Sequence, residues 1–163
     1  MKYLPFERIT YRTDWPEEKV IKALNEFVEP KQFGFGKTYT KEYEGYVNRN
    51  SFEISRIINY RNSFLPQING TVRTISNGTQ IDVTMKLNVF VLFFLIIWCS
   101  VASLFFVGMC GMMIRDHQIS IISLMPLLML LFVYILTMAG FKAESRKSKE
   151  FLRKSFEAEV LKD

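Results

Sequence analysis

Two long apolar stretches dominate the pattern of hydrophobic and polar positions along the chain. The first covers residues 87–114 and the second covers residues 118–141, and neither contains a charged side chain. A helix needs about 20 mostly apolar residues to cross the hydrocarbon of a bilayer. Because only a short polar break at 115–118 separates the two stretches, the pattern predicts a transmembrane hairpin with spans at about 89–113 and 119–141.

Before the hairpin the pattern alternates, which is typical of a β-strand with one buried and one wet face. Residues 79–87 alternate most clearly. The side chains expected in the core are Ile81, Val83, Met85 and Leu87, and those expected in water are Gln80, Asp82, Thr84 and Lys86. Residues 71–76 precede this strand, and the intervening Asn77-Gly78 predicts a tight β-hairpin in which both turn residues take positive φ.

Two further segments predict strands because they are rich in β-branched and aromatic residues. These segments are residues 6–13 and residues 46–60. Pro66 lacks the N–H that a central strand donates, so residues 61–69 are expected to form a loop or an irregular edge.

Two amphipathic segments predict helices on either side of these strands and of the hairpin. The first is residues 15–28, with Asp14 as N-cap and Pro30 as its end. Its apolar stripe consists of Val20, Ile21, Leu24, Phe27 and Val28. The second is residues 143–161, whose large apolar side chains include Phe151, Phe156 and Val160. This second helix either packs on the sheet or lies on the membrane surface.

Together these elements predict an α+β cytosolic domain, an antiparallel sheet with N-terminal and C-terminal helices, that carries a transmembrane hairpin. Residues 1–86 and 142–163 would form the domain, with the latter packing on the former, and residues 87–141 the hairpin. The element order resembles the helix-grip arrangement of START-like lipid-binding domains, with a hairpin inserted before the last helix. The stretch IINYRNSFLPQINGT, followed by two spans and a charged terminal helix, also resembles small uncharacterised bacterial two-span membrane proteins, a likeness that implies no activity.

The charge distribution predicts how the hairpin is oriented. The chain carries a formal net charge of +5, which we interpret as membrane topology and not as nucleic-acid binding. Basic residues gather where the hairpin meets the domain, at Lys86, Lys142, Arg146, Lys147 and Lys149, whereas the turn between the spans offers Arg115 alone. Both termini are therefore expected in the cytoplasm of a bacterium, with the turn outside the inner membrane. The first residues show no apolar signal segment.

The sequence contains no motif that predicts catalysis, a metal or a cofactor. His117 stands alone in the turn between the spans, without the neighbours that a metal site needs. Gly34–Lys37, in a loop rich in glycine and aromatic residues, lacks the spacing of a phosphate-binding loop. Cys99 and Cys110 lie too far apart on one helix to form a disulfide. The spans contain no ionisable residue of the kind that transport pathways use.

Two groups of residues are candidate contact sites. Arginine, tyrosine and amide side chains gather at Arg56, Tyr60, Arg61 and Asn62. They suit either an anionic ligand or a partner carboxylate, or they simply place positive charge on an edge strand to prevent pairing. Small residues share one face of the first span at Cys99, Ser103 and Gly111, which allows close packing on the second span or on another copy of the protein.

These observations predict an integral membrane protein that presents a small, non-catalytic binding or scaffold module at the inner membrane. Its expected partners are the lipid bilayer and either a second copy of the chain or another protein, but no nucleic acid. The alternative is a membrane-acting effector, or its immunity protein, whose hairpin oligomerises in the bilayer.

Overall fold

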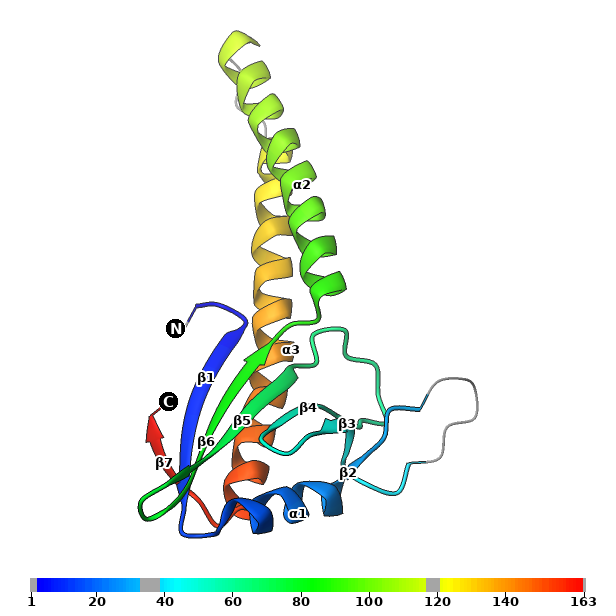
Figure 1. The fold of residues 1–163 in the computed structure, drawn as a ribbon. Coiled ribbons are helices and arrows are strands. Elements are labelled where there is room, and N and C mark those ends of the chain that lie inside the picture. Colours follow the sequence, from blue (N-terminus) through cyan, green and yellow to red (C-terminus); the bar gives the residue numbers. More distant parts are fainter. Residues whose placement is uncertain (1–2, 33–38, 117–120, 163) are drawn as a thin grey trace.

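The computed structural model describes residues 3–32, 39–116 and 121–162 and shows a sheet-based domain from which two long helices project (Figure 1). The strands are β1 (Phe6–Thr13), β2 (Val28–Glu29), β3 (Tyr43–Val47), β4 (Ser51–Arg56), β5 (Gln67–Ile75), β6 (Gly78–Lys86) and β7 (Glu159–Lys162). The helices are α1 (Glu17–Phe27), α2 (Val89–Asp116) and α3 (Met125–Ser155), and a short 3₁₀ turn, η1 (Ile121–Leu124), precedes α3.

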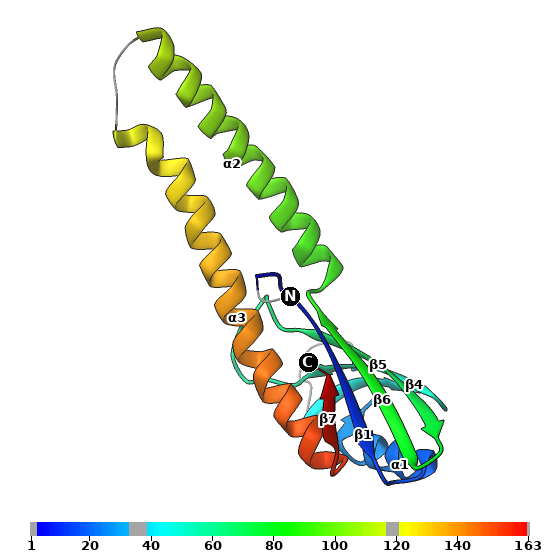
Figure 2. The ribbon, with the colours of Figure 1, turned by 90° about the vertical axis from the view of Figure 1, so that its left-hand side faces the viewer.

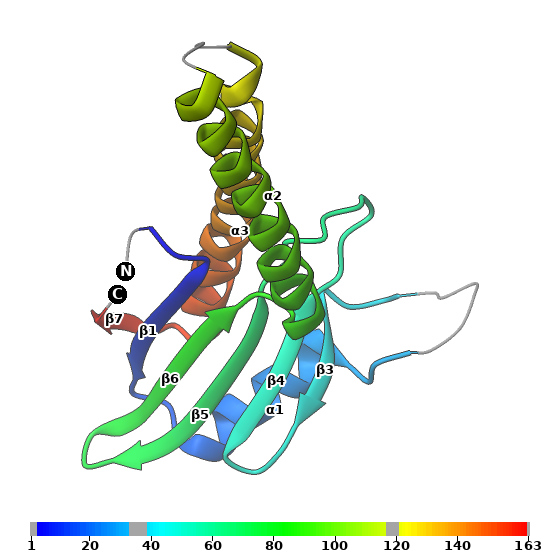
Figure 3. The ribbon, with the colours of Figure 1, turned by 90° about the horizontal axis from the view of Figure 1, so that it is seen from above.

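The strands form one seven-stranded sheet in the order β2-β3-β4-β5-β6-β1-β7. All neighbours in this order are antiparallel except β2 and β3, which are parallel. The expectation of a purely antiparallel sheet is therefore wrong at this edge, because α1 returns the chain to the sheet in the direction of β3. One face of the sheet is covered by α1 and by the C-terminal half of α3, and the other face is open (Figures 2 and 3).

The hydrophobic core lies between the sheet and these two helices. The predicted inward-facing residues of β6 are fully buried, and the adjoining Leu87 is nearly so, which confirms the alternation read from the sequence. They pack in one cluster with Leu24 of α1 and with Leu152 and Phe156 at the end of α3. Aromatic rings close one end of this cluster, with centroid separations of 5.1 Å for Phe27 and Phe151 and 5.0 Å for Tyr43 and Phe151.

Two described helices are long and apolar enough to cross a membrane. The segment Val89–Arg115 has a mean hydropathy of 2.7, and none of its most apolar window is buried against the rest of the protein. The corresponding window of α3 is 11% buried. A helix that is apolar around its whole circumference normally lies inside a protein core or in lipid. These helices instead project from the domain (Figure 2). Most of their large apolar side chains are exposed.

The tight turn between β5 and β6 differs in register from the prediction. Ile75 pairs with Gly78, so the turn residues are Ser76 and Asn77 and not Asn77-Gly78. Only Gly78 takes a positive φ, of 113°, and an added Cβ there would lie 2.1 Å from the carbonyl oxygen of Thr13. The predicted pairing of the two strands is displaced by two positions, and an even displacement leaves every side chain on its predicted face.

The first helix and the strands that follow it also begin and end at residues other than those predicted. Helix α1 begins after Pro16, which is its N-cap without a side-chain hydrogen bond, so Asp14 does not cap it. Val28 belongs to β2 and not to the helix. The predicted strand at 46–60 is two strands, β3 and β4, that form a hairpin, and the chain from 57 to 66 has no regular structure.

The predicted separate helix at 143–161 is wrong in two respects. Helix α3 runs without interruption from Met125 to Ser155, about 46 Å at 1.5 Å per residue, so its apolar half and its docked half are one element. After Ser155 the chain turns at Glu157, whose φ is 48°, and adds β7 to the edge of β1. The docked half of α3 lies on the sheet, which is one of the two alternatives left open by the sequence.

Candidate functional site

A buried carboxylate joins α3 to the sheet one turn beyond the apolar half of the helix. Glu144 is only 2% exposed, and three side chains donate to it. Arg56 at the end of β4 donates through Nη1 at 2.7 Å, the Tyr60 hydroxyl donates from the loop that follows, and Lys147 donates through Nζ at 2.8 Å. Burial raises the pKa of Glu144, but the hydrogen bonds from Lys147, Tyr60 and Arg56 outweigh it and lower the pKa below its ordinary value.

Three of the four residues predicted to bind an anion lie at or next to this cluster. Arg56 and Tyr60 do bind a carboxylate, but it is Glu144 of the same chain. Asn62 donates through Nδ2 to the carbonyl oxygen of Gly140 at 3.2 Å, so it also contacts α3. Arg61 is exposed and lies outside the cluster. Of the four predicted residues, the structure therefore leaves Arg61 facing solvent and brings the other three to α3.

A second carboxylate, Glu7 of β1, joins the same helix to the sheet at the strand next to the edge strand β7. Lys142 and Ser145 donate to it, and Lys149 forms an ion pair with it at 2.9 Å. Burial raises the pKa of Glu7, but the hydrogen bonds from Lys142, Ser145 and Lys149 are stronger in sum and lower the pKa to about 2. Glu7 is therefore charged at neutral pH.

The two carboxylates engage most of the basic residues predicted to flank the membrane. Lys142 and Lys149 pair with Glu7, and Lys147 pairs with Glu144. Arg146 and Lys86 are exposed. These lysines therefore hold α3 on the sheet in addition to lying next to the apolar half of the helix.

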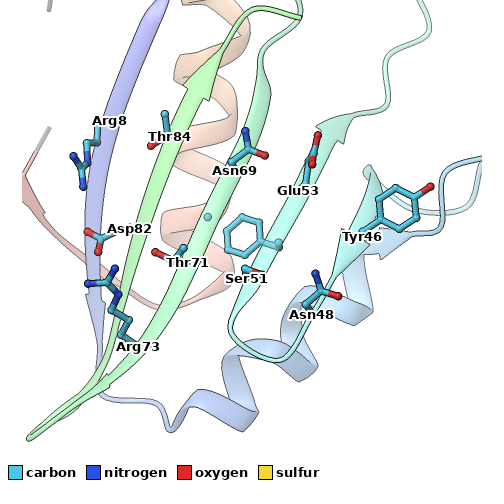
Figure 4. A pocket seen from close by; sticks show the side chains of 12 residues that line it. Arg8, Tyr46, Asn48, Ser51, Glu53, Asn69, Thr71, Arg73, Asp82 and Thr84 are labelled. Carbon is cyan, nitrogen blue, oxygen red and sulfur yellow. The ribbon is translucent and has the colours of Figure 1, made fainter. Parts of the chain in front are cut away.

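The open face of the sheet carries a shallow polar hollow of about 690 Å³ (Figure 4). Side chains from five strands line it, and its polar members are Arg8, Tyr46, Asn48, Ser51, Glu53, Asn69, Thr71, Arg73, Asp82 and Thr84. Asp82 accepts hydrogen bonds from Thr10 at 2.8 Å and from Gln80 at 3.1 Å. The hollow offers donors and acceptors of both charges, which suits the binding of a polar ligand or a polar protein surface.

Of the three small residues predicted to form a packing face on α2, Cys99 is half-buried, whereas Ser103 and Gly111 are not covered by α3. The Ser103 hydroxyl donates to the carbonyl oxygen of Cys99 at 2.7 Å, and Ser103 and Gly111 are exposed. A Cβ added to Gly111 would meet nothing within 4 Å. The half-buried positions of α2 are instead Val91, Leu95, Trp98, Cys99, Ala102, Phe106, Met109, Cys110 and Met113. Packing of Ser103 and Gly111 on another copy of the protein stays a prediction.

Neither Glu7 nor Glu144 was predicted from the sequence. Glu144 lies among charged residues that look solvated, and Glu7 stands between Phe6 and Arg8 in a strand whose local pattern indicates no partner for it. One signal was present: Phe141, Ser145, Ser148 and Leu152 recur at spacings of three and four, and small residues at such spacing allow a helix to lie close to a sheet. Glu144 flanks this stripe.

The described part of the chain contains no group of three or more His, Cys, Asp or Glu side chains that could hold a metal ion. His117 and Gly34–Lys37 lie outside the described residues. Comparisons with protein-family models, with curated proteins and with solved structures found no match to this chain.

Proposed function

We propose that the chain is a bacterial inner-membrane protein whose hairpin, α2 and α3, holds a small non-catalytic binding domain at the cytoplasmic surface. The apolar side chains exposed along both helices carry this proposal. Soluble monomers rarely expose contiguous apolar patches larger than a few hundred Å². Transfer of such side chains from water to hydrocarbon is favourable by about 25 cal/mol per Å², so lipid is the environment that suits them.

The way the hairpin joins the domain supports a scaffold role. Only Leu87 and Asn88 separate β6 from α2, and the Asn88 side chain accepts a hydrogen bond from the Phe90 N–H at 2.9 Å. Helix α3 continues into the core and is fixed there by Glu7 and Glu144. Two rigid connections would hold the domain in one orientation at the membrane and not on a flexible tether.

The binding surface belongs on the outside of the domain. Tyr11, Tyr43 and Phe156 are fully buried between the sheet and the helices, so side chains fill the interior. The polar hollow on the open face is therefore the surface that we assign to a protein partner or a polar ligand. The likeness to the helix-grip arrangement stays a proposal about architecture, supported by a long helix that lies across the sheet (Figure 1).

Cysteine labelling tests the membrane orientation. In a chain with Cys99→Ala and Cys110→Ala, one cysteine is introduced at Arg49 in the β3–β4 turn or at Arg115 at the end of α2. A membrane-impermeant maleimide should label Arg115→Cys in intact cells and Arg49→Cys only after the cells are lysed. The opposite pattern would overturn the orientation, and release of the protein from membranes by alkaline carbonate would overturn membrane insertion.

Membrane potential separates the scaffold from the effector alternative. A scaffold should leave the potential of the host cell unchanged when it is overproduced. Rapid depolarisation, compared with cells that produce a similar amount of an unrelated two-span protein, would favour the effector instead.

A further inference from the structure

The N-terminal segment exposes apolar side chains beside the apolar half of α3. Tyr3 is 78% exposed, Leu4 52% and Phe6 38%. The Tyr134 hydroxyl donates to the carbonyl oxygen of Tyr3 at 3.2 Å. Tyr134 precedes Phe141 by about two helical turns, roughly 10 Å along the axis, so Tyr3 lies alongside the part of α3 assigned to the membrane.

Exposed basic residues lie at the same level of the molecule. Lys86 is the antiparallel partner of Phe6, and β6 ends there, just before α2 begins. Arg61 precedes Asn62, which is bonded to the carbonyl oxygen of Gly140. The loop that carries Arg61 also approaches α3 closely, because a Cβ on Gly140 would lie 3.1 Å from Phe64. Three separate segments of the chain therefore meet at the base of the hairpin (Figures 1 and 2).

We propose that Tyr3, Leu4, Phe6, Arg61 and Lys86, here called the collar, form a binding surface for an anionic lipid leaflet. This inference rests on the proposed membrane location and adds that the domain itself is seated in the headgroup region. Aromatic residues concentrate at membrane interfaces, and Lys and Arg near the surface are attracted to anionic lipids. The collar combines both kinds of side chain at the level where the hairpin would enter the bilayer.

Among the described residues, the opposite end of the domain is more polar, and its aromatic ring, Trp15, is half-buried beneath Lys19 Nζ at 3.7 Å. The β3–β4 turn exposes Asn48, Arg49 and Asn50, and the first turn of α1 carries Glu17 and Glu18. Polar and acidic side chains there suit water. The other exposed large apolar residues described in the domain are Tyr46 on the open face, Tyr60 in the loop after β4, and Val160 and Leu161 on the edge strand β7.

Site-directed spin labelling tests the position of the collar in the full chain. In the background of Cys99→Ala and Cys110→Ala, a nitroxide is attached at Leu4→Cys, at Leu104→Cys in the middle of α2, or at Thr71→Cys on the open face. The protein is reconstituted in nanodiscs that contain phosphatidylglycerol and phosphatidylcholine. We expect the labels at Leu4 and Leu104 to be more accessible to oxygen than to a nickel chelate, and the label at Thr71 to show the reverse.

The possible results of this experiment distinguish failure of the collar from failure of the membrane location. If the label at Leu104 reports lipid while the label at Leu4 reports water, the collar is wrong and the membrane location survives. Low accessibility of Leu4 to both reagents would place a protein surface there and would also overturn lipid contact. If Leu104 itself reports water, the membrane location on which the inference rests is wrong.

A second measurement tests the charge of the collar. Spin-labelled phosphatidylglycerol should associate with the reconstituted protein more strongly than spin-labelled phosphatidylcholine, and the preference should weaken at high salt. The double variant Arg61→Gln and Lys86→Gln should move the ratio of the two association constants towards one. The matched control, Arg49→Gln and Arg73→Gln, removes the same charge far from the hairpin and should keep the ratio. Equal ratios in the two double variants would overturn the assignment.

Discussion

At the scale of single residues, Glu144 and Glu7 are the two places where charge is taken into the contact between α3 and the sheet. Each carboxylate is held by several donors, and the pKa of each is lowered despite burial. Burying a charge is costly unless its hydrogen bonds are satisfied, so such clusters contribute more to a defined orientation than to net stability. Removal of either carboxylate should nevertheless lower the free energy of unfolding, because it leaves Arg56 or Lys142 without its partner.

Replacing Glu144 tests this reading. Glu144→Gln keeps the shape of the side chain but removes the charge that Arg56 and Lys147 face. We expect a loss of about 2 kcal/mol, a value reduced because both cations are partly exposed. The melting temperature of the detergent-solubilised protein, followed by circular dichroism, should fall by roughly 5 °C. Glu150→Gln, on the same helix but exposed, is the matched control and should melt like the parent.

The lowered pKa of Glu7 predicts a specific dependence of stability on pH. Its pKa is about 2 in the folded chain and 4.5 ordinarily, so the folded state binds the proton less readily than the unfolded state. The stabilisation is complete above about pH 4.5 and is lost as the pH falls towards about 2. Glu7→Gln lacks this contribution, so its melting temperature should lie furthest below that of the parent at neutral pH and converge with it in acid. A difference that stays constant with pH would rule out this role.

At the scale of elements, the local sequence pattern predicted which face of a strand or helix is buried. It failed where pairing with a segment far away in the chain determines the secondary structure. The alternation in β6 and, except for Val28, the stripe of α1 were predicted correctly, because one face of each element is buried against the core. The end of α3 was not, because Phe151, Phe156 and Val160 fit a helical stripe as well as they fit a helix followed by a strand. Pairing of β7 with Tyr11 and Arg12, far away in the chain, selects the strand.

For the same reason, the sequence did not reveal which carboxylate the predicted anion site binds. Arg56 and Tyr60 were recognisable as a group that binds a carboxylate, but nothing local indicated that the carboxylate is Glu144, 88 residues from Arg56. The turn before β6 shows a related ambiguity. Gly78 was expected to take a positive φ and does, but the turn consists of Ser76 and Asn77, because Gly78 already pairs with Ile75 as the first residue of β6.

A pair of truncations distinguishes the observed end of the chain from the predicted helix. Phe156 is fully buried in the core, whereas Val160 is 43% exposed to solvent. Phe156→Ala should cost about 3–5 kcal/mol, the usual range for a buried aromatic side chain. Val160→Ala should cost less than about 1 kcal/mol, as at other surface positions. If the two variants lose similar amounts of unfolding free energy, measured by thermal unfolding in detergent, the predicted continuous helix at 143–161 would be supported instead.

At the scale of the whole molecule, the structure combines a sheet-based core with two long helices whose apolar side chains are exposed. The core draws its side chains from the sheet, α1 and the docked half of α3, and of the hairpin only Leu95 packs against it from α2. The apolar halves of α2 and α3 contact each other but are otherwise exposed. Folding of the domain should therefore depend little on the hairpin.

A shortened chain tests this independence. Residues 1–88 joined through a flexible Gly/Ser linker to residues 140–163 keep Glu7, Glu144 and the core, and lose the apolar halves of both helices. Such a chain should be monomeric without detergent and should unfold in one cooperative transition, as small single domains do. Leu4, which is 52% exposed, would then lie in water. Leu4→Ser should therefore raise the solubility of the shortened chain and leave its melting temperature unchanged. A shortened chain that is aggregated or melts without cooperativity, with and without this substitution, would show that the hairpin is part of the folding unit and that the two parts are one.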